Sequence, residues 1–98
     1  MNKKIKLLIR NSEKCKSILS KVKGFMFSLS RKPKFFIFEK EQRVRIHTFF
    51  CFFPLKIVYF DEDLKIVRRE IAKPFKILRS CKAKYILEIP FETAIKQK

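Results

Sequence analysis

The sequence is short of the residues from which small catalytic and cofactor sites are usually built. It has one glycine, Gly24, which excludes a glycine-rich loop wrapped around a phosphate. Its three cysteines, Cys15, Cys51 and Cys81, form no Cys-x-x-Cys pair, so we expect reduced, buried thiols and no metal site. The single histidine, His47, has no carboxylate near it in the sequence that would complete a triad. No catalytic residue and no cofactor are therefore expected.

Long hydrophobic runs are also missing. The longest uninterrupted apolar run, residues 49–55, is too short to cross a bilayer. The N-terminal run Leu7-Leu8-Ile9 is too short for the hydrophobic region of a signal peptide. We therefore expect no transmembrane segment and a cytoplasmic location.

Negative charge is scarce, whereas positive charge is abundant. The chain carries 25 Lys and Arg against 9 Asp and Glu, a formal net charge of +16. Residues 1–34 hold 11 of these cations against one acid, Glu13. Such a field favours an anionic partner, which could be nucleic acid, an acidic lipid surface or an acidic protein. The competing interpretation is that the lysines only keep the protein solvated.

The hydrophobic fraction of 47%, with 12 Phe, is ample for one core, and 98 residues predict a single domain over residues 1–98. Residues 4–9 are predicted to form a short strand. Residues 12–23 are predicted to form a helix capped by Asn11-Ser12 and stopped by Gly24. Its apolar face recurs with helical spacing at Cys15, Ile18, Leu19 and Val22.

Aromatic and β-branched residues dominate the rest of the chain and predict strands. The predicted strands are residues 34–38, 43–50, 55–60, 65–70 and 84–89. Residues 39–42 are expected to be a charged turn, and residues 61–64 a hairpin turn rather than a cation site. A short helix is expected over residues 91–98. The sum is an α+β fold, in which one N-terminal helix packs on a mostly antiparallel, curved sheet resembling a partial β-barrel.

Four motifs together resemble one known family. They are Gly-Phe-Met-Phe at residues 24–27, the phenylalanine-rich run ending in Pro-Leu-Lys at residues 46–56, Val-Tyr-Phe-Asp-Glu-Asp at residues 58–63, and Lys-Tyr-Ile-Leu-Glu-Ile-Pro at residues 84–90. Over residues 12–90 their order and spacing resemble the prokaryotic domain-of-unknown-function 192 family, also called uncharacterised protein family 0127, and its archaeal branch most of all. The resemblance implies no activity, cofactor or catalytic residue.

The chain departs from the pattern of this family in two ways that bear on structure. Lys56 stands where the family usually has aspartate, and the final glycine-aspartate strand of the family is not visible after Pro90. Without a closing strand, residues 84–89 would form an exposed sheet edge. This predicts weak self-association through that edge or docking of a partner strand.

The function expected from the sequence is that of a non-catalytic binding module for an unidentified ligand. The alternative is a nucleic-acid-associated protein that contacts phosphates through the lysines of the predicted helix, Lys14, Lys16, Lys21 and Lys23. A hydrolase-like enzyme is the weakest interpretation, since it would need polar groups such as His47 and Glu88 to meet in a pocket. The phenylalanines of residues 49–53 are expected to be core rather than a base-stacking platform.

Overall fold

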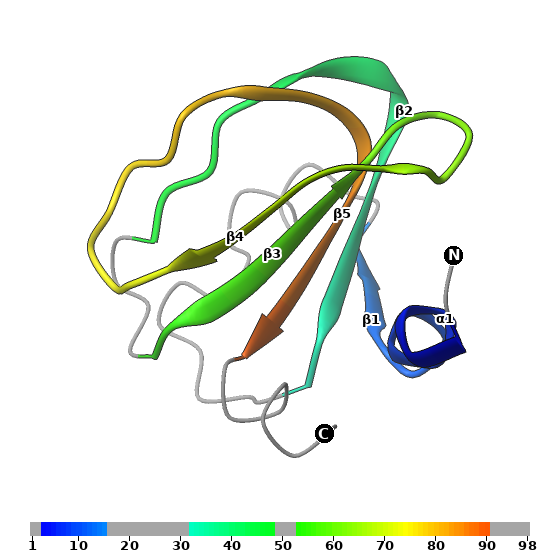
Figure 1. The fold of residues 1–98 in the computed structure, drawn as a ribbon, viewed down its shortest axis with the longest axis horizontal. Coiled ribbons are helices and arrows are strands. Elements are labelled where there is room, and N and C mark those ends of the chain that lie inside the picture. The colour runs from blue at the N-terminus through cyan, green and yellow to red at the C-terminus, as the bar shows by residue number, and fades with distance from the viewer. Residues whose placement is uncertain (1–2, 16–31, 49–52, 91–98) are drawn as a thin grey trace.

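The computed structural model describes residues 3–15, 32–48 and 53–90. These residues form one helix and five strands: α1 (Lys3–Arg10), β1 (Glu13–Cys15), β2 (Lys34–Val44), β3 (Leu55–Phe60), β4 (Ile66–Ala72) and β5 (Cys81–Pro90). The strands make one sheet in the order β1-β2-β5-β3-β4, in which only the β1–β2 pair is parallel (Figure 1). The described sheet stays open and does not close into a barrel. The predicted α+β fold with a mostly antiparallel sheet is confirmed.

The sheet carries apolar side chains on both faces, because successive residues of a strand point to opposite sides. Leu55, Ile57 and Tyr59 of β3 belong to a first core, whereas Val58 and Phe60 belong to a second core on the other face. All five are at most 1% exposed. The predicted strand at residues 55–60 is therefore confirmed, and its side chains are divided between the two cores.

Helix α1 covers the second core, where the sequence had predicted a strand at residues 4–9. Ile5 and Leu8 lie one helical turn apart and are both buried against that core. Figure 1 shows α1 beside β1, at the far side of the sheet from β4. The helix ends at Arg10, where the Ser12 hydroxyl donates to the Ile9 carbonyl at 2.6 Å. Ser12 thus closes one helix instead of starting another.

The predicted helix at residues 12–23 is wrong at its start. Residues 13–15 form strand β1, which pairs in parallel with β2. The rest of that helix, Gly24, the predicted helix at residues 91–98, and Phe49, Phe50, Cys51 and Phe52 lie outside the described residues. Phe53, at the end of the phenylalanine run, is 4% exposed and belongs to the first core, as expected.

Strand β2 includes residues 39–42, where a charged turn had been predicted. Five residue steps on β2, from Ile37 to Gln42, lie opposite only two steps on β5, from Tyr85 to Ala83. The excess residues bulge out of the ladder, so the charged side chains reach solvent without ending the strand. The turn at residues 61–64 is confirmed, and there the Asp61 carboxylate accepts bonds from the amides of Asp63 and Lys65, each at 2.9 Å.

Strand β5 is not an edge strand. It lies between β2 and β3 and pairs with both along most of its length. The predicted exposed edge at residues 84–89 is therefore wrong, and the reason for expecting self-association there no longer holds. Within the described part of the chain, no helix is long and apolar enough to cross a membrane.

Candidate anion-binding site

The pairing of β2 with β5 continues beyond the ends of both strands. The amide of Leu78 donates to the carbonyl of Ile46 at 2.9 Å, and His47 and Ile77 face each other as an isolated antiparallel bridge. Ile46 and Leu78 are half-buried and pack against the first core. Residues 45–48, which follow β2, and the link between β4 and β5 therefore form an irregular two-stranded ribbon at one end of the sheet.

Thr48 fixes this ribbon. Its side chain is 0% exposed, and its hydroxyl donates to the Lys73 carbonyl at 2.6 Å and accepts a bond from the Lys76 amide at 2.8 Å. Its own amide donates to the Lys76 carbonyl at 2.7 Å, and its carbonyl accepts from the Phe75 amide at 2.9 Å. A buried hydroxyl with both a donor and an acceptor partner holds the link between β4 and β5 in one conformation.

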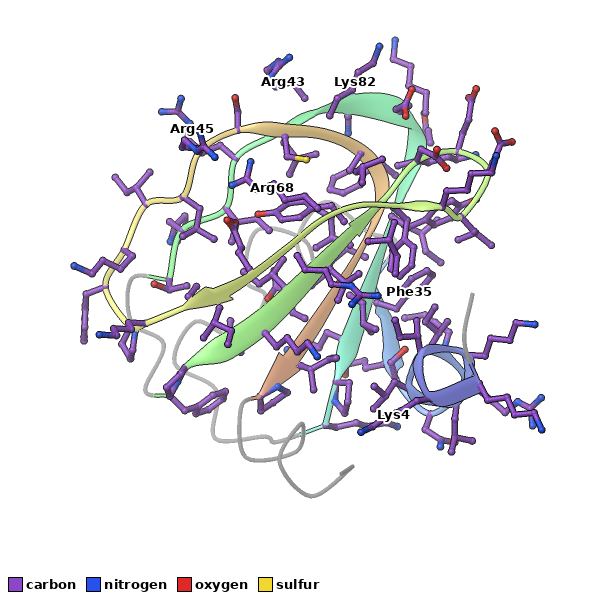
Figure 2. The ribbon with its side chains drawn as sticks, in the orientation of Figure 1. Lys4, Phe35, Arg43, Arg45, Arg68 and Lys82 are labelled. Atoms are coloured by element: carbon purple, nitrogen blue, oxygen red, sulfur yellow. The ribbon has the colours of Figure 1, made fainter. Side chains whose placement is uncertain are left out.

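Four exposed cations lie on the ribbon and on the adjoining ends of β2 and β5. Arg43 and Lys82 are direct partners in the β2–β5 register, and the register of the His47–Ile77 bridge places Arg79 opposite Arg45. We call Arg43, Arg45, Arg79 and Lys82 the basic rim. Figure 2 shows Arg43, Arg45 and Lys82 gathered at one end of the sheet. Because like charges directly opposite each other on a sheet destabilise it, an anion bound between them would relieve a cost.

Few carboxylates offset the basic rim. The Lys82 ammonium lies 4.0 Å from the Glu41 carboxylate, which is the outer limit of an ion pair. Within the described residues no carboxylate makes an ion pair with Arg43, Arg45 or Arg79. The sequence explains this, because residues 42–60 and 71–87 contain neither Asp nor Glu. Among the described residues, the positive charge of the rim is therefore largely uncompensated.

Arg68 does not belong to the basic rim but supports the backbone that carries Arg79. It donates to both oxygens of Glu70, which it approaches to 2.7 Å, and to the carbonyls of Arg79 and Ser80 at 3.2 Å. Its guanidinium also stacks over the Tyr59 ring, with its carbon 5.1 Å from the ring centroid. These bonds hold the backbone of the link that carries Arg79.

The contacts among Tyr59, Arg68 and Glu70 shift the pKa values of Arg68 and Tyr59. The hydrogen bond to Glu70 raises the pKa of Arg68 above its usual value. Burial, helped by the bond that its hydroxyl donates to Glu70 at 2.7 Å, raises the pKa of Tyr59. Arg68 and Tyr59 therefore keep their protons at physiological pH, and the support of the rim does not depend on pH there.

Of the four lysines predicted to contact phosphates, the structure describes Lys14, which does not lie on a helix. Lys14 lies in β1, and its ammonium donates to the Ile9 and Ser12 carbonyls at 2.6 and 2.9 Å, at the C-terminal end of α1. These bonds use the positive charge of Lys14 to cap α1. Lys16, Lys21 and Lys23 lie outside the described residues.

The two predicted pocket residues lie in different surroundings. His47 is exposed on the ribbon. Glu88 is 7% exposed in the central strand β5, opposite Lys34 of β2 and Ile57 of β3. Glu88 is thus enclosed in the sheet, with Lys34 as its basic partner on the neighbouring strand. Burial raises the pKa of Glu88 from 4.5 to about 7, and the nearby Lys34 charge opposes this rise.

The basic rim was not predicted from the sequence. A usable signal was present, namely the two acid-free stretches at residues 42–60 and 71–87. Their meeting in space depends on the β2–β5 register, which composition does not reveal. In the described part of the chain no group of His, Cys, Asp and Glu is arranged to hold a metal ion. Cys81 is a half-buried free thiol packed against the first core.

Comparisons with known proteins give both a family and a fold. The search of curated proteins gave no significant match. A crystal structure of a Sinorhizobium meliloti 1021 protein, described as a "putative transcription regulator", matches 87% of this chain and 71% of its own with a TM-score of 0.73 and 19% identity. A Novosphingobium aromaticivorans DSM 12444 protein of unknown function matches 88% of this chain and 66% of its own with a TM-score of 0.70 and 18% identity.

Both neighbours show a shared fold, and at these identities nothing more. The sequence itself matches the model of the DUF192 family, described as "Uncharacterized ACR", over residues 9–98. This range is wider at both ends than the resemblance over residues 12–90 had suggested. The expected kinship with an archaeal branch stays a prediction. The chain belongs to the DUF192 family.

Proposed function

We propose that this protein is a non-catalytic binding module whose basic rim binds the phosphates of a nucleic acid. The observation that carries the proposal is the row of four exposed cations that meet across the ribbon with one carboxylate at 4.0 Å. Three of the four are arginines, whose planar guanidinium groups match phosphate oxygens in pairs. The net charge of +16 would add long-range attraction to the same partner.

The structural neighbour from Sinorhizobium meliloti is described as a transcription regulator only provisionally, and its likeness to this chain concerns the fold. The proposal therefore rests on the rim. A non-catalytic role is supported by the positions of the polar groups that an enzyme could use. Glu70 is held by Arg68 and Tyr59, and Glu88 is buried in the sheet away from the exposed ribbon that carries His47.

The salt dependence of binding tests the proposal. Fluorescence anisotropy with a labelled random-sequence DNA oligonucleotide should show that log affinity falls linearly with log salt concentration. Replacing Arg43, Arg45, Arg79 and Lys82 by Gln should flatten that slope by about 3, because each phosphate that a cation neutralises adds roughly 0.7–0.9 to it. The rim substitutions lie on exposed positions, and thermal melting of each variant checks its fold.

A matched control separates the basic rim from bulk charge. Replacing Lys3, Lys4, Lys6 and Arg10 by Gln removes the same four charges from the exposed side of α1. This variant should keep most of the wild-type slope, because those cations are not at the contact surface. Equal slopes for the two variants, or a wild-type protein that does not bind at low salt, would refute the proposal.

A further inference from the structure

An apolar tip lies on the same link between β4 and β5 as Arg79 of the basic rim. Phe75 is 55% exposed and Ile77 is 60% exposed, and both lie on the link between β4 and β5 that also carries Arg79 of the rim. Lys73 and Lys76, on either side of Phe75, are exposed as well. An exposed aromatic ring among cations that can reach phosphates is the combination found in proteins that bind single strands.

The backbone holds Phe75 in this position. Its φ of 61° lies in the left-handed region, which residues other than glycine rarely occupy. The amides of Phe75 and Lys76 donate to the carbonyl and the hydroxyl of Thr48, which is fully buried. A local strain that the surroundings impose in this way is frequently found at functional sites, because it presents one side chain in a fixed orientation.

The geometry points to a single-stranded nucleic acid, with Phe75 stacked on a base while the basic rim holds phosphates of the same strand. This inference rests on the proposed function and narrows its ligand class. In a duplex the faces of the bases are covered by their neighbours, so an exposed phenyl ring has nothing on which to stack. Arg43 lies near the end of β2 and Arg45 one residue beyond that end, so their exposed guanidinium groups can contact different phosphates of one extended strand.

The chain has no tryptophan, which provides a direct probe of stacking. In a Phe75→Trp variant, the single indole would report on its own surroundings. Titration with oligo-dT should quench its emission at saturation, whereas a duplex of equal length should leave that emission unchanged. Vesicles of phosphatidylserine and phosphatidylcholine should leave it unchanged too. A blue shift on the vesicles without quenching by oligo-dT would overturn the inference in favour of a lipid surface.

Affinity measurements complete the test. Phe75→Ala should weaken oligo-dT binding by about 5- to 140-fold, which is the effect of removing one base–aromatic stack. Its salt slope should equal that of the wild-type protein, because the cations that meet the phosphates are all still present. Val67 is also an exposed apolar side chain, but it lies on β4. The control variant Val67→Ala should bind oligo-dT like the wild type.

The outcomes distinguish the two proposals. If the rim variant loses its salt slope while Phe75→Ala binds oligo-dT like the wild type, nucleic-acid binding stands and the single-strand inference falls. If the rim variant keeps its slope, the proposed function itself falls. Equal wild-type affinity for the duplex and for oligo-dT would also contradict the single-strand inference.

Discussion

Replacing Phe60 by Ala is expected to lower the free energy of unfolding by about 3–5 kcal/mol, the usual cost of emptying a buried phenylalanine site. Phe60 is 0% exposed and packs edge-on against Phe35 of β2, with ring centroids 6.2 Å apart. It belongs to the second core, which also holds Ile5 and Leu8 of α1. Since small domains are stable by only about 5–15 kcal/mol, this single change removes a large part of the total.

Urea unfolding followed by circular dichroism measures this loss as a lower midpoint. Phe75→Ala is the matched control, because it removes the same ring from a side chain that is 55% exposed. It should cost less than about 1 kcal/mol, in the range of surface substitutions. Similar costs for the two variants would show that Phe60 is not enclosed between the sheet and α1.

Replacing Glu88 by Gln is expected to change how stability depends on pH. Burial raises the pKa of Glu88 from 4.5 to about 7, so the folded protein keeps a proton there that the unfolded chain loses above pH 4.5. The stability supplied by neutral Glu88 is fully present below pH 4.5 and is lost as the pH rises to about 7. The loss amounts to about 3 kcal/mol, at 1.36 kcal/mol per pKa unit.

Because the amide of Gln cannot ionise, Glu88→Gln should escape this loss. Relative to wild type, its free energy of unfolding should rise by about 3 kcal/mol between about pH 4.5 and pH 7.5. Denaturant titrations at several pH values measure the difference. Glu62→Gln is the matched control, because it makes the same substitution at an exposed position in the hairpin turn. A pH-independent difference for Glu88→Gln would mean that Glu88 is ionised in the folded protein, held by Lys34.

Much of the fold could be predicted because the strands and the tight turn have clear local sequence patterns. Residues 55–60 are hydrophobic at every position except Lys56 and alternate between two faces, and Asp61 supplies the side-chain acceptor that a tight turn needs. The class, the hairpin and the antiparallel character follow from such patterns. The position of Glu88 did not follow, since alternation separates two faces but does not say which face is covered. Here both faces are covered, so a carboxylate among apolar residues is buried.

The N-terminal errors have a different cause. Ile5 and Leu8 are spaced for a helix, but the run of residues 4–9 is short enough to fit a strand as well, and tertiary packing decides between them. Lys14 fits a helical pattern in sequence, yet its ammonium caps the preceding helix. The candidate site was harder to predict than the fold. Charge predicted an anionic partner, but the basic rim exists only because β2 and β5 bring two acid-free stretches into register.

In the proposed function, the basic rim binds nucleic acid, and the positive charge of the rest of the surface does not. Backbone amide shifts recorded by two-dimensional NMR during a titration with oligo-dT test it most directly. The largest shifts are predicted at Arg43, Arg45, Arg79 and Lys82 and at the adjoining Phe75–Ile77 tip, with α1 little affected. Shifts centred on α1 and Lys14, or spread evenly over the exposed lysines, would contradict the account.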